Sequence, residues 1–547
     1  MQDNVRDTVF GHFVRLISDN RLLKFPDEVD SSLWKRCLQE ATNDDAEKEQ
    51  NPSSSGTTSM DDSEKPNVNQ VHPNGDKRED VYLVDWYGPE DPENPQNWSN
   101  SRKLLVTALI CILNFAVYVG SAIYTPGEES IMEEFGVNEI VATLGLSLFV
   151  LGYGLGPMLF SPMSEMPQVG RSGIYFWTLL AFVLLQLPTG YAVNMAMFLV
   201  FRFLTGFFGG PVLATGGATI ADMYPPSKVA YGICIWGAFG VLGPVLGPLV
   251  GGFAAQAKGW RWTIWELTWM CAFVLGTLFF LMPETSAANI LYKRAKRLRK
   301  STGEGKLKSQ SEIDAAEHTA RDHMIVLGRA FTLTFFEPIV FLLDLYTALL
   351  YGLLYIWFES FPLVFNGIYG FNVGEQGLAF LGIFVGGIIT VPCYLLWIKH
   401  FMVPRFSKPG VRPEMLLPPT FIGAFALPIC LFWYGWTARA SLHWILPIIG
   451  SGFFTVGVVT LFNAALNYLG MAYPAYAASV FAGNALMRSL FGVIFPLFAR
   501  ALFRRLGLGP GNSLLAGLSI LFIPIPFFLY HYGTRIRHAS KNARHDM

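Results

Sequence analysis

The segment WGAFGVLGPVLGPLVGG spans residues 236–252 and carries no charged side chain. Its glycines recur every three or four residues, at Gly237, Gly240, Gly243, Gly247 and Gly251. On a helix this spacing places them on one face, and small residues let neighbouring helices approach closely inside lipid. Pro244 and Pro248 each remove a backbone donor and bend the helix. The segment therefore predicts a bent membrane helix with one smooth face packed against a neighbour.

The chain around this segment has the composition of a membrane protein. Of its 547 residues, 52% are hydrophobic and 15% are charged, with a mean hydropathy of +0.36, whereas soluble proteins carry about 25% charged residues. The formal charge of −1 hides two parts, because residues 1–101 hold 10 Lys+Arg and 21 Asp+Glu, and residues 102–547 hold the other 30 and 20. Six cysteines, five of them in apolar stretches, follow no disulfide or metal-ligand spacing. These features exclude a soluble enzyme, a disulfide-rich secreted domain and a nucleic-acid-binding protein.

Twelve apolar stretches are long enough to cross a membrane, because a bilayer core of about 30 Å needs roughly 20 helical residues. They cover residues 104–124, 140–162, 173–191, 196–219, 229–254, 263–282, 336–361, 376–398, 417–436, 443–466, 477–499 and 512–532. Six precede a polar loop at 283–335 and six follow it, as in transporters built from two halves. We expect an all-α membrane protein with six-helix halves at 102–282 and 336–532, preceded by a largely disordered acidic tail at 1–101.

Two parts of that tail differ in pattern. Residues 40–80 are rich in Asn, Asp, Glu, Ser and Gly, so they cannot bury enough apolar surface to offset the entropy of ordering. Residues 4–23 place several apolar side chains on one helical face. They predict either a short amphipathic helix lying on the membrane or on the rest of the chain, or a weakly structured segment.

Lysine and arginine gather in loops on one side of the predicted bundle. The central loop holds ten of them, the loop after the eighth span holds four, and the C-terminal tail at 533–547 holds four. The loop after the first span holds five glutamates and no basic residue. Because basic loops mark the cytoplasmic side, we expect both tails and the central loop in the cytoplasm. Arg500, Arg504 and Arg505 oppose this rule, since they precede the twelfth span on the outer side.

Four short motifs together resemble one known family. They are the run at Gly243, Pro244, Gly247, Pro248 and Gly251, Ser164-Glu165 followed by Gly170-Arg171, Arg202 with Gly206, and DWYGPEDPENPQNWS at residues 85–99. The combination resembles fungal twelve-span drug:proton antiporters of the major facilitator superfamily, of the fluconazole/benomyl-resistance type, over about residues 85–540. Glu165 stands where that family usually has Asp, and the basic run that normally follows the Arg is missing.

The resemblance implies proton-coupled export of bulky hydrophobic or cationic compounds through the plasma membrane, by a monomer without cofactor or metal. It also implies that Arg202 takes part in proton coupling. Because Arg stays charged, a carboxylate must carry the proton. The candidates are Asp222, Glu266, Asp344 and Glu359, and the sequence does not choose among them. The alternative role for Arg202 is a structural hydrogen-bond anchor.

Further polar residues predict a gate and a cavity. Glu165, Gly170 and Arg171 lie in a short cytoplasmic loop, where charge pairs that form in one conformation gate access; a fixed salt bridge is the alternative. Helical spacing places Asp344, Tyr351, Tyr355 and Glu359 on one face of the seventh span, and polar faces point away from lipid. We predict that these residues line a substrate cavity together with Tyr118, Asn463, Asn484 and Arg488, unless they only join helices.

The sequence leaves the substrate open. No GxxxxGK[ST] phosphate loop and no HExxH, CxxC or GxSxG motif occurs, which argues against ATP-driven transport and against an enzyme. Rival interpretations are an exporter of one endogenous secondary metabolite or polyamine, a proton-coupled nutrient importer, and a channel or receptor. The Gly-Pro stripe argues against uptake, and the two-half pattern argues against a channel.

Overall fold

The computed structural model describes residues 5–30, 32, 82–303, 305–317, 320–406, 410 and 412–543. Within these ranges, twelve helical segments are long and apolar enough to cross a membrane, as the hydropathy pattern predicts. Helices suit this setting because they satisfy their own backbone hydrogen bonds without water. The segment at 40–80, for which composition predicts disorder, lies outside the described residues.

Helix bounds follow the predicted spans, and most helices extend a few residues further. The first six spans are α5 (Asn100–Ala122), α7 (Glu139–Glu165), α8 (Arg171–Gly190), α9 with α10 (Met195–Gly209, Val212–Met223), α11 (Pro226–Lys258) and α12 (Arg261–Leu281). The last six are α16 (Pro338–Phe361), α17 with α18 (Val373–Ala379, Leu381–Trp397), α20 (Pro418–Thr437), α21 with α22 (Ile445–Gly452, Phe454–Ala472), α23 (Ala477–Leu506) and α24 with α25 (Leu508–Phe522, Pro524–Ala539).

Short elements connect the spans. They are η2 (Thr125–Gly127), α6 (Glu128–Phe135), η3 (Pro362–Asn366), η4 (Ile398–Met402), α19 (Val403–Phe406), η5 (Pro413–Leu416) and η6 (Pro474–Tyr476). The central loop forms α13 (Ala287–Thr302), β2 (Leu307–Ser309), α14 (Gln310–Glu317) and α15 (Ala320–Phe336), and the head forms α2 (Val9–Ile17), α3 (Pro26–Val29), β1 (Tyr82–Val84) and η1 (Pro95–Asn97).

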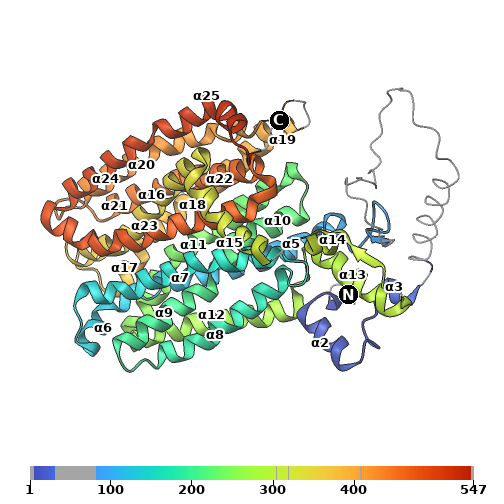
Figure 1. Ribbon diagram of the computed structural model, residues 1–547. Coiled ribbons are helices and arrows are strands. Elements are labelled where there is room, and N and C mark those ends of the chain that lie inside the picture. The colour runs from blue at the N-terminus through green and yellow to red at the C-terminus, as the bar shows by residue number, and fades with distance from the viewer. Residues whose placement is uncertain are drawn as a thin grey trace.

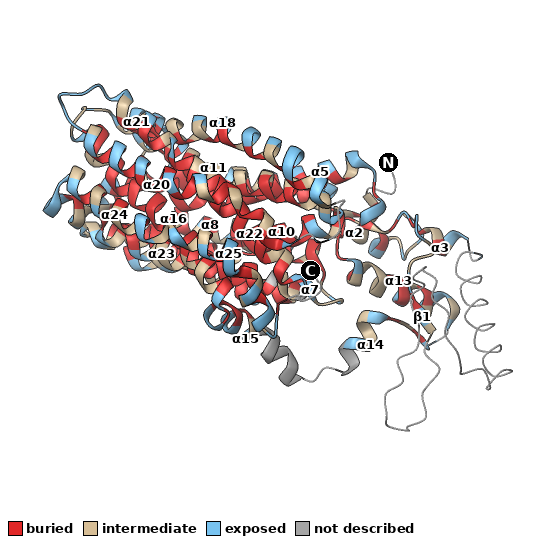
Figure 2. Cartoon of the chain, turned by 90° about the horizontal axis from the view of Figure 1, so that it is seen from above, coloured by how far each residue is buried: buried red, intermediate tan, exposed pale blue. Residues whose placement is uncertain are grey.

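The two sets of six spans lie side by side as two bundles, coloured blue to green and yellow to red in Figure 1. Both described ends of the chain lie at one end of the molecule with α13, and we call this the terminal end. The opposite end carries α6 and α17, and we call it the far end. Buried residues fill the interior of the bundles, while many outward faces are exposed (Figure 2), as expected for helices that meet lipid.

The glycine face of α11 packs against α5. A Cβ at Gly247 would lie 2.9 Å from the Ile123 backbone nitrogen, and one at Gly243 would lie 2.6 Å from the Tyr118 Cβ. A Cβ at Gly251 would overlap the Ile123 carbonyl oxygen. Side chains at these positions would force the two backbones apart, so the stripe is the tight seam that its spacing predicts.

The two described parts of the polar head pack on the first half and on the central loop. Strand β1 pairs in parallel with β2, with Tyr82 opposite Leu307. Helix α2 begins after the Thr8 cap and sets Phe10 against Phe279 of α12, with ring centroids 5.7 Å apart. This is the amphipathic helix predicted within residues 4–23, and it lies on another part of the chain.

A buried ion cluster joins the DPENPQNW segment to α13. Arg294 donates to Asp91 over 2.8 Å and lies 3.1 Å from Glu93, and the side chains of Arg294 and Asp91 are each 1% exposed. Burial acts to raise the pKa of Asp91, but the hydrogen bonds from Arg294 outweigh it and hold this pKa below its usual value. The segment next to the membrane therefore docks onto the start of the central loop.

Candidate substrate cavity and gates

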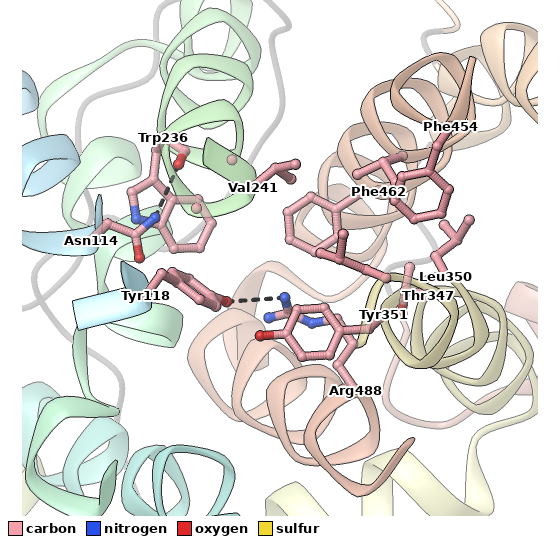
Figure 3. A pocket seen from close by; sticks show the side chains of 14 residues that line it. Asn114, Tyr118, Trp236, Val241, Thr347, Leu350, Tyr351, Phe454, Phe462 and Arg488 are labelled. Atoms are coloured by element: carbon pink, nitrogen blue, oxygen red, sulfur yellow. Dashed lines mark hydrogen bonds between the residues drawn. The ribbon is translucent and has the colours of Figure 1, made fainter. Parts of the chain in front are cut away.

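A small cavity lies where the two halves meet. It is lined by residues of α5, α11, α16, α22 and α23, including five aromatic rings, those of Tyr118, Trp236, Tyr351, Phe454 and Phe462 (Figure 3). The residues come from both halves, so relative motion of the halves changes the shape of the cavity. Such an apolar, aromatic lining suits a bulky flat molecule.

Arg488 is the charged residue of the cavity lining. Its guanidinium donates to the Tyr118 hydroxyl over 3.2 Å and lies over the rings of Phe462 and Tyr351, at 4.7 and 5.5 Å from their centroids. Across the described ranges, Arg488 forms no ion pair with a carboxylate. The cavity therefore presents a positive charge to its occupant. Figure 3 shows the hydrogen bond from Arg488 to Tyr118 as a dashed line.

A tyrosine cluster closes one side of the cavity. The Tyr355 hydroxyl donates to Ser121 Oγ over 2.7 Å and lies 3.0 Å from the Tyr153 hydroxyl, which also contacts that of Tyr351. Ser121 and Tyr153 belong to the first half, and the other two tyrosines to the second. Of the predicted cavity tyrosines, Tyr118 and Tyr351 face the space, whereas Tyr355 lies in the seam behind it.

Asp344 lies directly behind the cavity wall. It is fully buried and accepts a hydrogen bond from Asn484 Nδ2 over 2.8 Å; the same amide group also donates to Thr347, which lines the cavity. Asn484 is one helical turn before Arg488 on α23. The predicted residues Asp344, Asn484 and Arg488 thus form one connected group, of which only Arg488 reaches the cavity itself.

Asn463 lies at the seam between α11 and α22, beside the cavity. Its amide nitrogen donates to the Val459 carbonyl in its own helix over 2.9 Å. Its oxygen faces Gly237, where a Cβ would approach to 3.2 Å. This buried oxygen has no hydrogen-bond partner within the described part of the chain, so Asn463 is a seam residue whose acceptor is unused.

Arg202 is fully buried away from every carboxylate that was a candidate partner. Its Nε donates to the Gly145 carbonyl over 2.9 Å and its Nη1 to the Gly120 carbonyl over 3.0 Å. Its guanidinium also lies 4.3 Å from the centroid of the Phe149 ring. These contacts join α9 to α7 and α5, which is the arrangement of the structural-anchor alternative.

Asp222 lies at the terminal end and pairs with Arg171. Arg171 donates through Nε and Nη2 to the two oxygens of Asp222, the second over 3.3 Å. Glu284 accepts from the Arg171 backbone nitrogen over 3.0 Å, and Gly170, with φ of +72°, leaves room for it. Glu165 is exposed at the end of α7. The loop pair is thus Arg171–Asp222 within one half, and not a pair with Glu165.

Glu284 was not among the predicted gate residues. The sequence signal for it is a carboxylate placed directly after an apolar span. Spacing did not indicate its partner, because Gly170 and Arg171 lie more than a hundred residues earlier in the chain.

Two other candidate carboxylates lie outside the cavity. Glu266 borders a lateral apolar groove between α5, α11 and α12, together with residues such as Phe115 and Trp269. Glu359, which was predicted to line the cavity, lies at the far end and bonds Arg500. Glu359 lies on the same face of α16 as Tyr351, but that face continues past the cavity to the ion cluster around Arg500.

The far-end cluster joins the two halves through Arg500. Its Nη1 lies 2.6 Å from Glu139 and its Nη2 lies 3.1 Å from Glu128, while its Nε bonds Glu359. Arg504 also bonds Glu139, over 2.9 Å. These contacts explain how Arg500 and Arg504 are accommodated on a side where basic residues were not expected.

The sequence and the fold were compared with those of known proteins. The profile of the Major Facilitator Superfamily matches residues 110–533. Transporter mfs1 of Schizosaccharomyces pombe is 43% identical over 98% of this chain and 99% of its own length, and fluconazole resistance protein 1 of Saccharomyces cerevisiae is 43% identical over 85% of each chain. The cycloheximide resistance protein of Candida maltosa is 36% identical over 98% of this chain and 99% of its own. Among solved structures, the proton:xylose symporter XylE covers 80% of this chain and 96% of its own at a TM-score of 0.55 and 15% identity.

Proposed function

This chain belongs to the major facilitator superfamily, and we propose that it exports bulky aromatic compounds from the cytosol in exchange for protons, through the plasma membrane. The observation that carries the proposal is the aromatic cavity between the halves, with its single lining arginine. Relatives named for resistance to fluconazole and cycloheximide, and as multidrug transporters, support drugs as the class of cargo.

The orientation follows from charge. Helix α13 at the terminal end is strongly basic, and basic segments stay in the cytosol. In this proposal the terminal end therefore faces the cytosol, with both tails, and the far end faces outside. A compound enters from the cytosolic side and leaves at the far end as the halves rock about the cavity.

The charge of the cavity narrows the substrate class. Because Arg488 lines the space and Glu359 does not, the cavity attracts electron-rich rings and weakly acidic groups, and it repels cations. We therefore propose neutral or weakly acidic aromatic substrates, in place of the cationic ones that the predicted position of Glu359 favoured.

Asp344 is the best supported carrier of the exchanged proton. It is buried next to the cavity, and its Oδ2 has no hydrogen-bond partner within the described ranges, so a proton there satisfies an otherwise costly buried oxygen. Asn484 links it to the helix that carries Arg488. Asp222 already pairs with Arg171, and Glu266 lies in the lateral groove, so neither serves this role as well. Arg202 acts as an anchor for α9.

The test is drug accumulation in proteoliposomes that hold the full-length protein in the inside-out orientation. With an acidic interior that represents the outside, inside-out vesicles accumulate fluconazole, an aromatic drug, and a protonophore abolishes accumulation. Asp344→Asn removes the response to the pH gradient, because the variant cannot exchange a proton. Glu266→Gln is the matched control and keeps the response.

Three results would contradict this proposal. Accumulation that ignores the protonophore would remove proton coupling, and a wild-type response in Asp344→Asn would remove Asp344 from it. Preferential accumulation of a permanently cationic dye such as rhodamine 6G would overturn the substrate class. Transport of one natural metabolite, with no transport of fluconazole, would instead support the exporter of an endogenous compound.

A further inference from the structure

One edge of the Arg500 guanidinium is shared by two carboxylates from different halves. Nε and Nη2 form the edge that commonly binds both oxygens of a single carboxylate. Here Nε bonds an oxygen of Glu359 from α16, and Nη2 bonds an oxygen of Glu128 from α6 over 3.1 Å. The two carboxylates are therefore held side by side on one edge of a single guanidinium.

Both carboxylates are buried and incompletely bonded. The side chain of Glu128 is 3% exposed and that of Glu359 is 1% exposed. The second oxygen of each is buried without a hydrogen-bond partner in the described residues. One arginine cannot neutralise two such charges, and an uncompensated charge away from water is costly.

Within the described residues, no arginine or lysine other than Arg500 forms an ion pair with Glu128 or Glu359. Arg504 bonds both oxygens of Glu139 and is 62% exposed, so it neutralises that third carboxylate at the mouth of the cluster. The titratable and charged groups that face the pair are Tyr124, Glu129, Glu139, Arg202, Arg500 and Arg504. Their sum leaves the buried core of Arg500, Glu128 and Glu359 one negative charge in excess.

We propose that Glu128 and Glu359 share one proton, taken from the outer solution, and that this proton holds the far end closed. The proposal rests on the orientation given above, in which the far end faces outside. A proton between two close carboxylates removes the excess charge and supplies a donor for a bare oxygen. This site is separate from Asp344, because the cluster does not border the cavity.

Opening of the far end explains how the proton is released. Glu359 and Arg500 belong to the second half and stay together as a neutral pair, while Glu128 and Glu139 move away with the first half. Glu128 then meets water and ionises. The closed state thus binds one proton more than the open state, so acid outside favours closure and alkali favours opening.

The test measures opening of the far end by thiol labelling in intact cells. Ser147 of α7 is buried and donates to the Val493 carbonyl of α23 over 3.0 Å, so a Ser147→Cys variant reacts with a membrane-impermeant maleimide only when this seam opens. Its rate is divided at each pH by that of Glu133→Cys, an exposed outer position, which cancels the pH dependence of the thiol.

We expect the normalised labelling to be at least about tenfold slower at external pH 5.5 than at pH 7.5, since one proton changes an equilibrium up to tenfold per pH unit. Glu128→Gln and Glu359→Gln each mimic the protonated acid, so either one gives slow labelling that no longer depends on pH. Glu134→Gln is the matched control, because Glu134 lies on the same helix but pairs with Arg261 within one half.

The outcomes separate this proposal from the proposed function. Asp344→Asn keeps the labelling response even though it loses exchange, and a failure of drug accumulation leaves the response unchanged. Wild-type labelling that does not vary with external pH would overturn the shared proton, as would a full response in both glutamine variants. A response that follows external sodium at constant pH would show that a metal cation occupies the site instead.

Discussion

At the scale of single residues, the proposed substrate class rests on Arg488, the charged residue that lines the cavity. It lies among aromatic rings with the Tyr118 hydroxyl as its hydrogen-bond acceptor. A guanidinium in this setting is only weakly compensated, so an electron-rich or anionic substrate gains from it more than it would in water.

Substitution of Arg488 should change selectivity more than expression. A hydrogen bond to a charged group contributes about 1.5–3 kcal/mol, so Arg488→Leu is expected to weaken transport of a weakly acidic aromatic drug about tenfold or more. Neutral substrates should be less affected. Competition for drug accumulation in the vesicles described above measures this difference.

Two variants control the Arg488 experiment. Arg488→Lys keeps the charge but loses the planar stacking surface, so it should fall between the wild type and Arg488→Leu. Arg439→Ala changes an arginine that lies over Trp436, away from the cavity, and should leave selectivity unchanged. Equal losses for acidic and neutral drugs in Arg488→Leu would contradict the proposed role.

Helical spacing correctly predicted which residues near the cavity share a face, but not where that face ends. Tyr118, Tyr351 and Arg488 line the space as expected. The position of Glu359 was wrong because its partner, Arg500, lies 141 residues further along the chain. Pairings at such distances leave no local pattern in a single sequence.

At the scale of elements, the seam between α5 and α11 has almost no free volume. Its close backbone approach follows from the glycine stripe, and both helices also contribute residues to the cavity. A change in their separation therefore alters the cavity directly, without touching any polar residue of the site.

A methyl group in this seam should be harmful where the same change elsewhere is not. Gly247→Ala places a Cβ 2.9 Å from the Ile123 nitrogen, and overpacking of this kind costs about 1–3 kcal/mol. We expect a lower midpoint of thermal unfolding for the purified protein and a lower transport rate. Gly276→Ala on α12 is the control, because no atom lies within 4 Å of its added Cβ; equal stability of both variants would contradict a tight seam.

The hydropathy pattern found every span, and one of the larger errors at a helix end has an electrostatic cause. Helix α23 continues to Leu506, beyond the predicted end at residue 499. Its last turns carry Arg500 and Arg504, which lower the hydropathy of the segment. These turns remain helical and packed on the bundle because Glu139 of the other half bonds both arginines. A hydropathy profile contains no information on such ion pairs.

At the scale of the whole molecule, the polar head and the central loop form a cap on the terminal end of the first half. The head docks through α2, β1 and the Asp91 segment onto α12, α13 and β2. Its composition predicted little structure, because composition does not reveal that Arg294 and Asp91 meet 203 residues apart. The cap fixes the start of the loop that connects the two halves.

Removal of Arg294 should release this cap. Arg294→Ala leaves Asp91 buried without its cation, although Arg297 still pairs with Glu93. Loss of one partner of a buried pair costs about 3–5 kcal/mol. Hydrogen exchange of residues 82–99 is expected to rise strongly, while the spans keep their protection.

Because Arg294 holds the pKa of Asp91 low, the contribution of this ion pair to docking is present above the unfolded pKa of Asp91, near 4. It is lost only as the pH falls through the lower pKa of the folded protein. The wild-type cap should therefore stay docked at pH 5. Lys296→Ala is the control, because Lys296 is exposed on the same helix, and it should behave as the wild type. Slow exchange of residues 82–99 in Arg294→Ala would show that the strand pair and the packing of α2 hold the cap without the buried ions.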